Sequence, residues 1–181
     1  GVVGLKEDIN TLPKSYFVGD GDIYIFRWKK TLVTSGYAQQ VFNSDLGGYT
    51  GKISLKAWAQ GAKDLRELVL AVKPTATRVV GKFGLAYALA RMTQQGIGAE
   101  IDFKNEKSLS DLFIENFYEV LLEVPKGTDI SKSPISEYVE MECIGSTGGD
   151  RLNLRGFESL MVKDLSETYQ LGWRQNFESL A

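Results

Sequence analysis

The sequence predicts an α+β fold in which helices cover a mixed, largely antiparallel sheet. Runs rich in β-branched and aromatic residues interleave with stretches of helical periodicity along the 181 residues. Several neighbouring strands are joined by turns too short for the crossover that a parallel pair needs. No repeat or linker divides the chain, so we expect one domain over 1–181, with a lead-in segment at 1–17 and a terminal strand and helix at 155–181.

The composition limits the kinds of molecule that the chain can bind and the chemistry that it can perform. A net charge of -2 gives no basic surface for nucleic acid, and no apolar run reaches the roughly 18 residues that a membrane helix needs. One cysteine permits no internal disulfide, which is consistent with the cytoplasm, and we expect Cys143 to be a small buried hydrophobe. Histidine is absent, so catalysis would have to use carboxylates, Lys or Tyr, which disfavours a self-contained enzyme.

The first half of the chain predicts a strand and two helices. Ile23–Phe26 is a β-rich run after turn residues, and the segment from Thr34 to Phe42 has helical spacing with Thr34 or Ser35 as the N-cap. Ser54 is expected to cap a longer helix that ends near Pro74. Its predicted core stripe consists of Leu55, Trp58, Ala59, Ala62, Leu65, Val69 and Val72.

The second half predicts further strands and a terminal helix. In Ala99–Phe103 the apolar residues alternate with Glu100 and Asp102, which places both acids on the face away from the core. The remaining expected elements are a short helix opened by Ser108, strands at Val120–Val124 and Tyr138–Ile144, a hairpin through Gly145–Asp150 to Arg151–Leu154, and a helix from Leu165 to Leu180.

Between the halves, Ala76–Leu85 predicts a strand that runs through glycines into a helix. Free N–H groups and the positive end of the helix dipole meet at such a turn, which suits an anion. Gly81, Lys82 and Gly84 are therefore candidate phosphate- or nucleotide-binding residues. The alternative is that the turn needs glycine for its backbone conformation alone and that Lys82 is a solvated turn residue.

Eight segments occur in a fixed order along the chain: Val3–Asp8, Val18–Asp20, Ser35–Tyr37, Gly84–Met92, Gly98–Asp102, Leu112–Glu115, Leu121–Val124 and Ile144–Leu152. Together they resemble the C-terminal domain of the AIR synthase superfamily, and within it the family of phosphoribosylformylglycinamidine synthases, most closely the second synthetase-like half. This resemblance covers nearly the whole chain and implies an excised C-terminal piece of a larger protein.

The resemblance implies a nucleotide site whose side chains are only partly kept. The family motif Asp-x-Ser-Asp-Gly-Gly-Leu falls on Val79–Leu85, so a valine stands where the family has a magnesium-binding Asp, and Gly81 stands where it has a Ser that contacts nucleotide. Valine cannot coordinate magnesium. We therefore expect no metal site in this chain, while Lys82 could still attract a phosphate.

Weaker candidates follow from two partial motif matches. Ser35 matches the serine of Gly-Gly-Ser-x-Tyr, and Glu115 matches the acid of Phe-Ser-Glu-Ser, in which Asn116 replaces the second serine. The alternatives are that Ser35 is a helix cap and that Glu115 is a surface residue. No catalytic residue is assigned.

The function that the resemblance implies is that of a structural or auxiliary domain of an ATP- and glutamine-dependent ligase of purine biosynthesis. ATP and magnesium are then cofactors of the parent enzyme, and its synthetase-like N-terminal domain and glutaminase domain are the partners. We expect no cofactor in the isolated chain, no ligase activity from it, and a homodimer as one option for its assembly. The alternatives are a standalone, non-catalytic assembly module and a domain of another superfamily enzyme, of the thiamine-monophosphate kinase or hydrogenase-maturation type.

Overall fold

The computed structural model describes residues 8–29, 33–34, 54–105, 107–116, 119–130, 133 and 135–178, with backbone only for 33–34 and 173–178. Residues 1–7 of the lead-in segment, Ser35 and the predicted helix beyond Thr34 lie outside this part of the chain. Thr34 itself lies in a short strand, β2 (Val33–Thr34), which pairs with β5 (Glu115–Asn116) in a two-stranded sheet.

The main sheet is built on β1 (Gly21–Trp28), whose alternating side chains serve both faces. This strand pairs antiparallel with β6 (Glu119–Pro125) on one side and with β7 (Val139–Thr147) on the other. Ile23 and Ile25 lie in one hydrophobic cluster, whereas Phe26 and Trp28 lie in a second. The sheet therefore has a core on each face.

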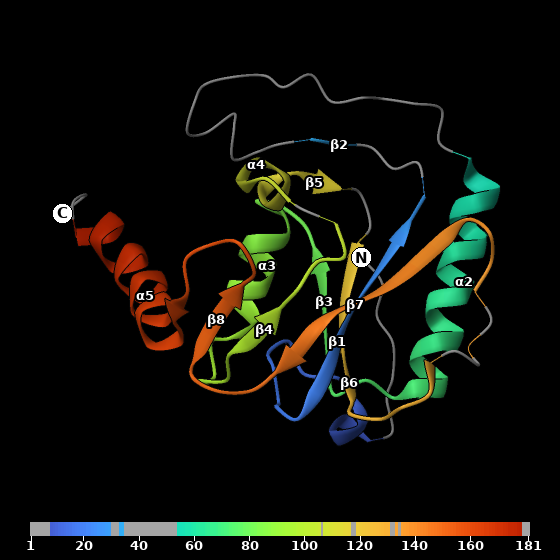
Figure 1. The fold of residues 1–181 in the computed structure, drawn as a ribbon, viewed down its shortest axis with the longest axis horizontal. Coiled ribbons are helices and arrows are strands. Elements are labelled where there is room, and N and C mark those ends of the chain that lie inside the picture. The colour runs from blue at the N-terminus through green and yellow to red at the C-terminus, as the bar shows by residue number, and fades with distance from the viewer. Residues whose placement is uncertain are drawn as a thin grey trace.

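In the part of the chain that the structure describes, the main sheet has seven strands in the order β3-β6-β1-β7-β4-β8-β9. The others are β3 (Ala76–Val80), β4 (Ala99–Ile101), β8 (Arg151–Leu154) and β9 (Leu160–Met161). Only the β4–β8 pair of this sheet is parallel in the described residues. The predicted α+β fold with a mixed, largely antiparallel sheet is confirmed (Figure 1).

Helix α2 (Leu55–Val72) packs on the face that carries Phe26 and Trp28. Ser54 caps it as predicted, because its side chain accepts a hydrogen bond from the Ala57 N–H. The predicted stripe is partly wrong, since Ala59 and Ala62 are exposed and Leu55 is 81% exposed. The buried positions are Gly61, Asp64, Leu68 and Val72.

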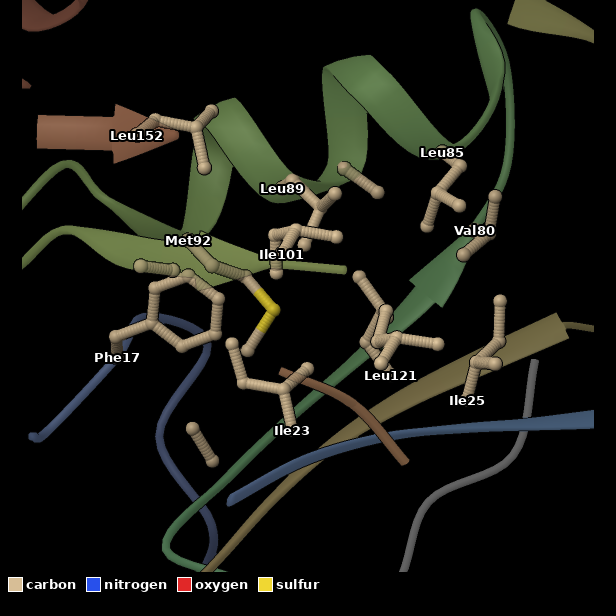
Figure 2. Packing of buried hydrophobic residues seen from close by; sticks show 14 of the residues in the cluster. Phe17, Ile23, Ile25, Val80, Leu85, Leu89, Met92, Ile101, Leu121 and Leu152 are labelled. Atoms are coloured by element: carbon tan, nitrogen blue, oxygen red, sulfur yellow. The ribbon is translucent and has the colours of Figure 1, made fainter. Parts of the chain in front are cut away.

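Helix α3 (Gly84–Met92) covers the opposite face, and Figure 2 shows its Leu85, Leu89 and Met92 directed at the sheet. They meet apolar side chains of β1, β3, β4, β6 and β8 together with Phe17 from the segment before β1. The short helix α4 (Leu109–Phe113), opened by a capping box of Ser108 and Asp111, packs beside α3. This packing fixes the strand-to-helix turn against the core.

The hairpin predicted from Ile144 to Leu154 is wrong, because β4 lies between β7 and β8. The Gly98 N–H donates to the Gly149 carbonyl, and the Gly148 N–H donates to the Gly98 carbonyl. A Cβ on Gly98 would lie 2.1 Å from the Arg151 carbonyl oxygen, so this insertion needs glycine. The predicted alternation in β4 is confirmed, since Ala99 and Ile101 are buried and Glu100 is exposed.

Cys143 is exposed, so its predicted burial is wrong. A register shift in the pairing of β1 and β7 brings Cys143 opposite Tyr24, while the next residue, Ile144, enters the core. Burial and the nearby Cys143 raise the pKa of the Tyr24 hydroxyl.

One buried acid holds several loops together. Glu123 on β6 is fully buried, and its carboxylate accepts hydrogen bonds from the Val18 and Gly19 N–H groups and from the hydroxyls of Thr75 and Thr147. This set of donors satisfies both carboxylate oxygens without a cation. The sequence shows only a polar residue within an apolar strand.

The chain continues from β9 into α5 (Val162–Glu178), as the terminal helix prediction required. A 3-10 turn at Ile9–Thr11 precedes the sheet. Within the described residues, no helix is both long and apolar enough to cross a membrane.

Candidate functional site

The candidate site is the turn between β3 and α3. β3 ends at Val80, Gly81 and Lys82 are exposed, and the Gly84 N–H donates to the Gly81 carbonyl over 3.0 Å. Two consecutive residues take positive φ values, 70° at Phe83 and 71° at Gly84. The turn thus departs from ordinary backbone conformations where α3 begins.

Gly84 is required on steric grounds as well. A Cβ there would lie 2.7 Å from the Ile114 carbonyl oxygen and 2.8 Å from that of Leu112, both of which belong to backbone. A Cβ on Gly81 would meet nothing within 4 Å. The two glycines therefore differ: Gly84 serves the fold, and Gly81 leaves an open surface.

Glu115 reaches the same turn from β5. Its Oε1 accepts a hydrogen bond of 2.8 Å from the Phe83 N–H, at the N-terminus of α3. A carboxylate at a helix N-terminus is stabilised by the free N–H groups and the helix dipole. The Glu115 carboxylate thus occupies part of the turn at which the sequence predicts a bound phosphate.

Asn116 is directed toward the sheet. Its Nδ2 donates to Glu119 Oε1 over 3.1 Å, and the same oxygen lies 3.1 Å from Arg27 Nε. Burial raises the pKa of the Glu119 carboxyl above its usual value, and Arg27 and Asn116 oppose this shift without cancelling it. Asn116 therefore supports a largely buried ion pair.

The position of the family's metal ligand is occupied by an apolar surface residue. Val79 is 61% exposed and offers no oxygen ligand. Among the described residues, no group of three or more His, Cys, Asp or Glu side chains could hold a metal ion. The residues of the turn do not fit a magnesium ion held as the resemblance implies.

Sequence reasoning missed a cluster of arginines and tyrosines beside the turn. Arg91 Nη1 donates to the Tyr87 hydroxyl over 3.1 Å, and the Arg91 guanidinium lies 4.1 Å from the centre of the Tyr169 ring of α5. Arg78 on β3 donates to the Ser15 carbonyl over 3.1 Å. Burial and the neighbouring Arg91 charge lower the pKa of Arg78. The spacing of Tyr87 and Arg91, four residues apart, was the available signal.

A cavity of about 440 Å³ lies between this cluster and the turn. It is lined by Thr77, Arg78, Val79, Gly81, Lys82, Tyr87 and Ala88. Two cationic side chains, one tyrosine and one exposed apolar residue thus face a single hollow. Such an arrangement is suited to an anionic group attached to a less polar body.

A second hollow lies away from the turn. It measures about 620 Å³ and is formed by the segment Asn10–Lys14 and the end of α2 with Lys73–Thr75. Its lining includes Leu12, Val18 and Leu70, all of them exposed. None of the predicted site residues lies there.

Comparison with known proteins finds sequence similarity to one kind of synthetase. No family model matches it. It is 26% identical over 187 residues, all of this chain and 25% of the relative, to the phosphoribosylformylglycinamidine synthase subunit PurL of Methylocella silvestris. It is 29% identical to the same subunit of Campylobacter concisus over 92% of this chain and 23% of the relative. The chain spans about a quarter of the length of these curated relatives.

Solved structures agree on the fold. PurL of Thermotoga maritima complexed with FGAR superposes with a TM-score of 0.60, at 14% identity, over 87% of this chain and 30% of that one. The same protein complexed with ATP gives a TM-score of 0.57, at 15% identity, over 87% and 28%. The chain is thus similar in sequence to the PurL subunit of phosphoribosylformylglycinamidine synthase and shares the fold of part of that protein.

Proposed function

We propose that this chain serves as a structural, auxiliary domain of a phosphoribosylformylglycinamidine synthase, an ATP- and glutamine-dependent ligase of purine biosynthesis. The similarity to PurL along the whole chain supports the assignment. The observation that carries the auxiliary role is Val79, which puts an exposed valine where the family has its metal-binding Asp. Other domains of such an enzyme, a synthetase-like domain and a glutaminase domain, would supply the catalytic groups.

The turn then acts as the remainder of a nucleotide site. Gly81 and Lys82 lie exposed on one side of it, where a phosphate can approach, and Gly84 sets the backbone. The Phe83 N–H is bonded to Glu115, so a phosphate would have to rely on the neighbouring groups. Ser35 is proposed as a further contact on its motif position alone.

The isolated chain is predicted to be inactive as a ligase, because it lacks histidine and a carboxylate at Val79. Formylglycinamide ribonucleotide, ATP, magnesium and glutamine or ammonia are incubated with the pure chain, and product is followed by chromatography. A complete phosphoribosylformylglycinamidine synthase is the positive control. Turnover by the chain alone would refute the auxiliary role.

Reading the gene on both sides of this sequence separates the proposal from its alternatives. A longer synthetase region with several further domains beside it supports the proposal, whereas a single upstream synthetase domain of typical domain size would indicate another superfamily enzyme. A gene that encodes this domain alone would indicate an assembly module.

A further inference from the structure

The cavity beside the turn has a charge that the described part of the chain does not neutralise. Arg78 and Lys82 line it, and Arg91 donates a hydrogen bond to the hydroxyl of Tyr87, which also lines it. No acidic side chain is among the lining residues, and these three cations form no ion pair with another described residue. The positive potential is therefore directed into the hollow.

Arg78, Arg91 and Lys82 also have N–H donors without a hydrogen-bond partner among the described residues. Among the described residues, the Arg78 side chain has one hydrogen-bond partner, the Ser15 carbonyl, whereas a guanidinium carries five N–H groups. Arg91 Nε is buried and has no hydrogen-bond partner among the described residues. Lys82 Nζ rests 5.1 Å from the centre of the Phe83 ring, where it contacts no carboxylate of the described chain.

From this arrangement we propose that the cavity lined by Arg78, Lys82 and Tyr87 binds the phosphate group of a small phosphate monoester without a metal ion. A phosphate monoester carries nearly two negative charges at neutral pH, which matches converging cations better than a carboxylate does. The guanidinium fork of Arg78 suits two phosphate oxygens. The volume of about 440 Å³ leaves room for the esterified group against Tyr87 and Val79.

The proposed phosphate site lies beside the strand-to-helix turn that the proposed function treats as the remainder of a nucleotide site. It rests on the proposed function only for this location. The anion would be held chiefly by side chains of β3 and α3, next to the helix N-terminus where Glu115 already bonds the Phe83 N–H. Assembly with other synthetase domains is a separate matter, because phosphate can bind whether or not the chain has such a partner.

Calorimetric titration of the whole chain with inorganic phosphate and with phenyl phosphate, in the presence of EDTA, tests the proposal. We expect both to bind, and phenyl phosphate to bind more tightly. Arg78→Gln should weaken binding about tenfold or more, since a charged hydrogen bond contributes on the order of 1.5–3 kcal/mol, and Lys82→Ala should weaken it several-fold. Lys126→Ala, an exposed lysine on the turn after β6, is the matched control and should bind as the wild type does.

The titrations can contradict the proposal in two ways. If the wild type binds neither probe, both the cavity and the remnant phosphate site are wrong. If it binds but Arg78→Gln and Lys82→Ala bind equally well, the anion sits elsewhere and the cavity is wrong. Should Arg78→Gln fail to fold because it loses Ser15, Arg78→Lys and Tyr87→Phe replace it, and the former should still weaken binding because lysine lacks the fork.

Discussion

At the scale of single residues, Gly84 and Gly81 form a natural pair of test positions within one turn. Gly84 has a φ of 71°, and a Cβ added there would lie within 2.8 Å of two backbone carbonyl oxygens, whereas Gly81 faces open space. Gly84→Ala should lower the free energy of unfolding by about 2 kcal/mol or more. Gly81→Ala should change it by less than about 1 kcal/mol, and urea unfolding measures both. Equal effects of the two substitutions would mean that the turn is not built as described.

The same turn shows what residue patterns could and could not predict. Glycine spacing located the strand-to-helix turn, and the family motif drew attention to Glu115. Neither the glycine spacing nor the motif reveals that the Phe83 N–H donates a hydrogen bond to the Glu115 carboxylate. That contact joins β5 to the turn across more than thirty residues. The arginines in and near the cavity were missed for a related reason. Arg78, which lines the cavity, and Arg91 belong to different elements, and only packing brings them together.

At the scale of elements, α2 is fastened to the loop before β7 through Asp64. Its carboxylate accepts bonds of 2.8 Å from Gln60 Nε2 and from the Ser136 N–H. Burial raises the pKa of Asp64, but the hydrogen bonds from Ser136 and Gln60 outweigh it and hold the pKa below its usual value. Because the folded-state pKa is the lower one, Asp64 stabilises the fold above its unfolded pKa, and this contribution is lost as the pH falls through the folded value.

Asp64→Asn should therefore be less stable than the wild type at pH 7, by about 1–3 kcal/mol, and this difference should shrink below about pH 4. Urea unfolding across this pH range measures it, with Glu158→Gln as an exposed-acid control that should show no such trend. A deficit that stays constant with pH would contradict the assigned role of the Asp64 carboxylate.

Elements whose signals are local were predictable, and their pairing was not. Ser54 and Ser108 lie directly before the helices that they cap, so the sequence predicts both helix starts, and the structure adds the capping box of Ser108 with Asp111. The hairpin after Ile144 has equally good turn residues, yet β4 inserts between its two strands. The order of strands in the sheet depends on contacts between segments that are far apart in the sequence. A turn motif is local and does not contain that information.

At the scale of the whole molecule, the fold and the sequence are both similar to those of PurL, while the turn has a valine at the position of the metal-binding Asp in the motif it resembles. A fold can persist while the site grafted on it changes its chemistry. In our account, Glu115 takes one N–H of the former anion cradle, Val79 replaces the metal ligand, and Arg78 with Lys82 provides positive charge beside them. Phosphate binding would then survive without magnesium.

The most direct test of this account is to compare the dissociation constant of phenyl phosphate for the intact chain in EDTA with that in excess magnesium chloride. Because the cavity supplies guanidinium and ammonium groups and no oxygen ligands from charged residues, we predict the same dissociation constant in both conditions. Binding that appears only with magnesium, or that tightens about tenfold with it, would contradict the account and restore a metal-dependent nucleotide site.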